Sequence, residues 1–146
     1  MIRAPRASDQ SYVASTWHKS ILRGTYPHER HRSARSGPQL TALIDAVLDR
    51  KDTKVLVRAR PHDPDAIMGW VLFVEGAGIP VVHYVYTRAD DREGGIATAL
   101  LFQAGVRKDQ PVVCTSDGPD SALLRARYPL ATYMPLAEFL RPVKVS

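Results

Sequence analysis

The residues best placed to do chemistry lie between an apolar strand and a helix, in the stretch Arg92-Glu93-Gly94-Gly95-Ile96-Ala97. Residues 80–87 before it are rich in β-branched and aromatic side chains, which is typical of a strand. Residues 96–102 after it favour a helix whose first turn is small. A strand that leads through glycines into a helix places several backbone N–H groups at the positive end of the helix dipole. This stretch therefore predicts an anion site, most naturally for a phosphate.

Glycine suits position 95, because a side chain there would stand between the backbone amides and a bound phosphate. Other phosphate loops match less well: a P-loop needs Lys followed by Ser or Thr after its second glycine, and a dinucleotide loop needs three spaced glycines. The sequence has neither pattern here. The simpler alternative is a structural β–turn–α junction with a glycine cap, since short glycine motifs are common.

The string 92–97 matches Arg/Gln-x-x-Gly-x-Gly/Ala and, with its flanking strand and helix, closely resembles the acetyl-coenzyme A pyrophosphate loop of the GNAT superfamily of N-acetyltransferases. Small phage- and prophage-encoded members are the nearest likeness. The resemblance implies that the pantetheine arm of acetyl-CoA (CoA) lies as an extra strand along Val85, Tyr86 and Thr87. It also implies that the pyrophosphate lies on the amides of Arg92, Gly94, Gly95, Ile96, Ala97 and Thr98. The acids Asp90, Asp91 and Glu93 crowd this loop and would weaken anion binding unless they point to solvent.

The resemblance implies direct transfer of the acetyl group to a primary amine, in a ternary complex and without a covalent enzyme intermediate. An amine with a pKa of about 10.4 must lose a proton to attack. His83 is the best candidate base, and strict alternation along the strand puts it on the face of Val85, opposite to Tyr84 and Tyr86. A buried histidine that is hydrogen-bonded to backbone is an equally weighted alternative. Glu75, at the end of the preceding strand, is the fallback base.

The departing CoA thiolate needs a proton, for which many family members use a tyrosine in the helix after the fifth strand. The expected position in this chain holds Ala126, so the nearest candidate is the displaced Tyr128. A second interpretation is therefore a GNAT-like binding or structural module that keeps the fold, and CoA binding with it, without turnover. The acceptor amine, on a small molecule or a protein, is not identified by the sequence, and a homodimer stays open.

The composition fits one globular domain over residues 1–146, with 45% hydrophobic and 24% charged residues. There is no run long enough to span a bilayer and no signal-peptide core. Cys114 lies in an apolar run, so we expect it to be a buried strand residue in a cytoplasmic protein. No Cys/His cluster has metal-ligand spacing, so no metal is expected. Much of the net charge of +5 comes from residues 1–35, which favour an anionic partner, although nucleic acid is not supported by any motif.

The elements that must position these residues follow from hydrophobic periodicity. The expected strands are 1–5, 54–60, 66–75, 80–87, 111–116 and 131–134, and the expected helices are 10–22, 39–49, 96–102 and 119–127. The segment 23–38 is expected to be a basic loop that borders the acceptor site. This order is the one expected of a GNAT domain. The predicted fold class is α/β (α+β): a central mixed, mostly antiparallel sheet, splayed at its middle strands, with helices on both faces.

Overall fold

The computed structural model describes residues 2–20, 37–76, 78–88, 95–116, 124–134 and 136–140, without the side chains of 37–40 and 137. Its elements follow in the order β1 (Ile2–Arg3), α1 (Ala7–Ser20), α3 (Gly37–Leu48), β2 (Thr53–Arg60), β3 (Asp63–Val74), β4 (Val81–Thr87), α4 (Ile96–Gln103), β5 (Val112–Cys114), β6 (Ala131–Tyr133) and α6 (Leu136–Phe139). Residues 124–127 are also helical. The predicted strands are all present, with bounds shifted by a few residues.

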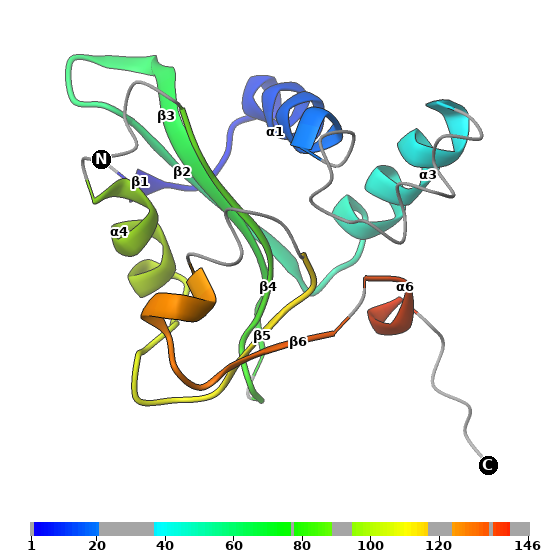
Figure 1. Ribbon diagram of the computed structural model, residues 1–146. Helices are drawn as coiled ribbons and strands as arrows, with labels where there is room; N and C mark the ends of the chain where they lie inside the picture. Colours follow the sequence, from blue (N-terminus) through cyan, green and yellow to red (C-terminus); the bar gives the residue numbers. More distant parts are fainter. Residues whose placement is uncertain are drawn as a thin grey trace.

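Within the described chain, six strands form one sheet in the order β1-β2-β3-β4-β5-β6. The pairs from β1 to β4 are antiparallel, whereas β4–β5 and β5–β6 are parallel. Helices α1, α3 and α6 lie on one side of the sheet and α4 lies on the other (Figure 1). We call these sides the α1 face and the α4 face.

A separate group of buried side chains fills each side of the sheet. On the α1 face, Val13 and Trp17 of α1 pack on Trp70, Leu72 and Tyr84. On the α4 face, the members are Val71, Phe73, Val82, Ile96, Leu100, Leu101, Val106, Val112, Cys114, Leu124 and Tyr128. The predictions that Trp17 belongs to the core and that Cys114 is a buried strand residue are confirmed.

Helix α1 begins at Ala7, three residues earlier than predicted. The expected N-cap region 7–9 is already helical, and the Asp9 carboxylate accepts a hydrogen bond from the Arg6 N–H at 2.7 Å. Asp9 is thus the N3 residue of a capping box, whose side chain accepts from the N–H of the N-cap residue, and is not the N-cap itself. It also pairs with Arg3, and this hydrogen bond lowers the pKa of the Asp9 carboxyl.

Helix α6 was not predicted from the sequence. Leu136 within it is fully buried in the group on the α1 face, and Phe139 packs against that group. Most of the expected basic loop, residues 23–36, falls outside the described residues, while residues 37 and 38 belong to α3.

Candidate functional site

The start of α4 has no side-chain cap among the described residues. Gly95 is the N-cap of α4 and adopts a left-handed conformation with φ 69°, which favours glycine. A Cβ built on Gly95 would meet no atom within 4 Å. Because the first N–H groups of a helix have no intrahelical acceptor, this end of α4 can receive an anion at Ile96, Ala97 and Thr98. The predicted loop residues Arg92 and Gly94 lie outside the described residues.

Gly69 holds the start of α4 against the sheet. Gly69 pairs with Arg58 on one side and with Thr87 on the other. A Cβ at Gly69 would lie 2.5 Å from the Tyr86 carbonyl oxygen and 3.1 Å from Ile96 Cγ2. Only glycine permits this approach, so Gly69 places the first turn of α4 beside the end of β4. The sequence had suggested a bulge near Gly69, and the register between β2 and β3 does shift next to it.

Strands β4 and β5 separate part of the way along β4. Their last rung pairs Val82 with Cys114, and the Thr115 N–H donates to the Val82 carbonyl at 3.1 Å. β5 ends there, while β4 continues to Thr87. The described strands thus form a splay that is closed at Val82 and open toward Thr87, as the predicted fold class required.

One edge of β4 faces this splay. The Arg88 N–H donates to the Met68 carbonyl at 2.9 Å, which turns the backbone of Arg88 toward β3. Backbone groups alternate along an antiparallel strand. The N–H and C=O groups of Val85 and Thr87 therefore point away from β3, to the side where β5 no longer pairs, whereas those of Tyr86 point toward β3. An extended ligand could hydrogen-bond to Val85 and Thr87 as a further strand would.

A β-bulge sits at the closed end of the splay. Val82 pairs with Phe73 and Tyr84 pairs with Leu72, so His83 is an extra residue on β4. The prediction that His83 shares a face with Val85 was wrong, because the bulge shifts the alternation. His83 lies beside Trp17 and Phe139 on the α1 face, with Tyr84, whereas Val85 packs on the α4 face.

The His83 side chain is enclosed. It is 0% exposed, and its Nδ1 lies 2.8 Å from the hydroxyl of Thr115, which is 0% exposed as well. The Trp17 ring stacks at 6.5 Å between centroids, and Phe139 meets the imidazole edge-on at 4.9 Å. The pKa of His83 is lowered to about 4, chiefly by burial and then by the charge of Arg50, while Asp52 partly opposes them. His83 is therefore neutral at physiological pH.

The backbone at the other two predicted proton carriers lies away from the open end of the splay. The Val112 N–H donates to the Leu130 carbonyl at 3.5 Å, so the turn after Tyr128 lies beside the start of β5. The splay opens beyond Thr115, about 10 Å further along the strand at 3.3 Å per residue. Tyr128 is buried on the α4 face, and burial raises its pKa. Glu75 follows the β3 residue that pairs with Val81, and its exposed carboxylate lies 3.8 Å from Lys54 Nζ.

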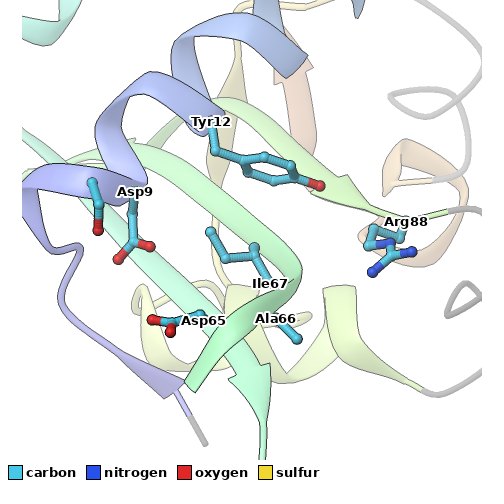
Figure 2. Close-up of a pocket in the computed structure, with 7 residues that line it drawn as sticks. Asp9, Tyr12, Asp65, Ala66, Ile67 and Arg88 are labelled. Atoms are coloured by element: carbon cyan, nitrogen blue, oxygen red, sulfur yellow. The ribbon is translucent and has the colours of Figure 1, made fainter. Parts of the chain in front are cut away.

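A polar cavity of about 700 Å³ opens at the far end of β4, on the α1 face. Its lining residues are Ser8, Asp9, Tyr12, Asp65, Ala66, Ile67 and Arg88. The two carboxylates lie on one side, Arg88 lies on the other, and the Tyr12 ring stands between them (Figure 2). Arg3 pairs with Asp9, and Arg6 pairs with Asp65 at 2.9 Å. Each acid of the cavity is therefore already neutralised by an arginine.

The described residues contain no group of three or more His, Cys, Asp or Glu side chains that could hold a metal ion. Among the helices that the structure describes, none is long and apolar enough to cross a membrane. The imidazole of His83 and the hydroxyl of Thr115 lie enclosed at the closed end of the splay.

No protein-family model matches the sequence, and a search of curated proteins finds no significant match. Solved structures do match. An aminoglycoside 6'-N-acetyltransferase from Acinetobacter haemolyticus aligns over 100% of this chain and 97% of its own, with a TM-score of 0.50 and 14% identity. A tetramutant of the BH1408 protein from Bacillus halodurans aligns over 100% and 96%, with a TM-score of 0.54 and 15% identity.

A further structure, described as a transcriptional regulator from Bacillus halodurans C-125, aligns over 89% of this chain and 90% of its own. Its TM-score is 0.55 at 17% identity. Identities this low establish a shared fold and nothing finer. The GNAT fold class predicted from the sequence is confirmed.

Proposed function

Because this chain has the GNAT fold, we propose that it is an N-acetyltransferase that moves the acetyl group of acetyl-CoA to a primary amine in a ternary complex. One observation carries the proposal: the start of α4, opened by the left-handed Gly95, lies next to the splayed edge of β4. The first feature suits a pyrophosphate and the second suits an extended amide-containing arm. Acetyl-CoA carries both groups in this order.

The cofactor would bind mainly through backbone atoms. Its pyrophosphate would rest on the amides of the loop and first turn, namely Arg92, Gly94, Gly95, Ile96, Ala97 and Thr98. Its pantetheine arm would pair with Val85 and Thr87, whose backbone groups face the splay, with Tyr86 between them. Such an arm would begin at Thr87, beside the start of α4, and run along β4 toward the bulge. The thioester would then lie near the backbone of His83.

In the reaction, the amine nitrogen attacks the thioester carbonyl carbon, a C–N bond forms and the C–S bond breaks. The nitrogen loses one proton, and the CoA sulfur gains one. Full transfer from an ammonium of pKa about 10.4 to His83, whose pKa is about 4, would cost roughly 9 kcal/mol at about 1.4 kcal/mol per pKa unit. We therefore assign the amine proton to water, and the buried His83 receives no role in proton transfer. Tyr128 and Glu75 receive no role in proton transfer.

The acceptor amine would have to meet the thioester near the bulge of β4. The basic segment 23–35, which lies outside the described residues, was predicted from the sequence to border the acceptor site. Its charge would favour acceptors that carry a carboxylate or phosphate near the amine.

Release of CoA thiol, together with mass spectrometry of the amine, tests the proposal. The panel consists of paired amines with and without a neighbouring carboxylate or phosphate, assayed from pH 6 to 9. We expect turnover that rises with pH, because more of the amine is unprotonated, and that is faster for the anionic member of each pair. Absence of turnover with every amine would contradict the proposed acetyltransferase activity.

The second candidate is a module that binds CoA without turnover. The observation in its favour is the enclosure of His83, which is 0% exposed although it was the best candidate base from the sequence. Binding of acetyl-CoA without acetylation of any amine in the panel would select this candidate over the enzyme.

A further inference from the structure

An open groove of about 800 Å³ lies between α4 and the strands β1 and β2. From the helix it is lined by Gly95, Thr98 and Phe102, which are three and four residues apart and so share one side of α4. From the sheet it is lined by Ile2 of β1 and Arg58 of β2. The groove therefore begins at the N-cap of α4 and follows the helix from there.

Arg58 reaches the groove from the sheet. In the register of the strands, Arg58 is paired with Ile2 on one side and with Gly69 on the other. Both neighbours belong to the α4 face, because Ile2 packs on the group of buried side chains there and a Cβ at Gly69 would meet Ile96. Residues that are paired across neighbouring strands point to the same side of a sheet. The half-buried Arg58 side chain thus projects toward α4.

The charge of Arg58 has no partner in the part of the chain that the structure describes. Arg3, Arg6 and Arg50 each pair with an aspartate, whereas no ion pair among the described residues includes Arg58. The Nε atom of Arg58 is buried and has no hydrogen-bond partner there either. A buried donor without an acceptor costs free energy, which a bound acceptor would recover. Phosphate suits this position, because the guanidinium fork matches its oxygens.

We propose that this groove binds the ribose 3′-phosphate of CoA and that Arg58 is its contact. The inference rests on the proposed function, in which the pyrophosphate lies at the start of α4. The pyrophosphate joins the pantetheine arm to the adenosine, whose ribose carries the 3′-phosphate. The arm would enter the splay between β4 and β5, while the groove lies on the other side of β4, toward β1 and β2. The adenosine half would then leave the pyrophosphate at Gly95 and bring its 3′-phosphate to Arg58.

Calorimetric titration with CoA and with 3′-dephospho-CoA isolates this contact, because the two ligands differ in the 3′-phosphate alone. The test variant is Arg58→Gln, and Arg58→Lys keeps the charge without the fork. The matched control is Lys108→Gln, which removes the same charge from an exposed residue that does not line the groove. Where Arg58→Gln does not fold, Arg58→Met keeps an unbranched apolar stem and removes the charge.

Wild type should bind CoA about tenfold more tightly than 3′-dephospho-CoA, which is the order expected for a hydrogen bond between charged groups. Arg58→Gln should bind the two ligands nearly equally, Arg58→Lys should keep part of the preference, and Lys108→Gln should keep all of it. Each result is a ratio of two affinities for one protein, so a general loss of affinity does not alter it.

A preference in Arg58→Gln equal to that of wild type would overturn the inference, and if both ligands were weakened together it would place Arg58 at the pyrophosphate instead. Equal binding of CoA and 3′-dephospho-CoA by wild type would also overturn the inference while leaving the proposed function intact. Failure of wild type to bind either ligand would overturn the proposed function, and the inference with it.

Discussion

The burial of His83 predicts a specific loss of stability in mild acid. The pKa of His83 is lowered by burial to about 4 in the folded chain, against 6.5 as the ordinary value. As the pH falls below 6.5, the unfolded chain binds a proton at this residue while the folded chain does not. The stability contributed by neutral His83 is therefore present above pH 6.5 and is lost progressively between pH 6.5 and 4.

The pKa difference of His83 between the folded and unfolded chain corresponds to roughly 3 kcal/mol of unfolding free energy. About 2 kcal/mol of this is lost between pH 7 and pH 5. Arg50 and Asp52 are the charged groups that act on His83, and both keep their charge across this range. Asp9 and Asp52 have lowered pKa values, so their own losses begin below the range.

Urea unfolding at pH 7 and pH 5 measures the effect, and the buried Trp17 and Trp70 provide the fluorescence signal. The comparison is between wild type and His83→Gln, since other titrating groups affect both alike. Wild type should lose about 2 kcal/mol more than the glutamine variant between the two pH values. Equal losses in the two proteins would show that His83 is not held neutral by burial and would refute the reasoning.

Two further predictions concern the core around the splay. Gly69→Ala should destabilise the chain by about 1–3 kcal/mol, because its Cβ would press on the Tyr86 carbonyl oxygen and on Ile96. The control is Gly78→Ala, whose Cβ would meet nothing within 4 Å, so its melting temperature should be nearly unchanged. Equal melting temperatures for these two variants would contradict the proposed contact. Cys114 is buried, and burial raises its pKa to about 11. An alkylating reagent at pH 8 should therefore modify Cys114 only after urea is added. Rapid modification of the folded chain would contradict the buried position of Cys114.

The strands and α4 could be predicted from the sequence because their signals are local. Residues 81–87 carry the β-branched and aromatic side chains of a strand, and Gly95 marks the helix start by a conformation that other residues avoid. The order of the elements and the splay then followed from the resemblance to a known fold.

The face of His83 could not be predicted in this way. Strict alternation fails at the bulge, and the bulge depends on how β4 aligns with Leu72 and Phe73 of β3, which no residue of β4 signals by itself. Thr115 was missed for the same reason, because it gains its role only when β5 lies beside β4. Helix α6 was missed because it has only four residues, too few for a helical period to show in the sequence.

The central claim is that an anionic cofactor binds at the start of α4, and calorimetric titration of acetyl-CoA tests it most directly. The informative pair is Gly95→Asp and Gly95→Asn, because both side chains have the same size, asparagine tolerates a left-handed backbone, and nothing lies within 4 Å of the added Cβ. Only the aspartate adds a negative charge beside the phosphates. Wild type should bind acetyl-CoA, and Gly95→Asp should bind it at least about tenfold more weakly than Gly95→Asn. Equal affinities in the two variants, or no binding by wild type, would contradict the claim.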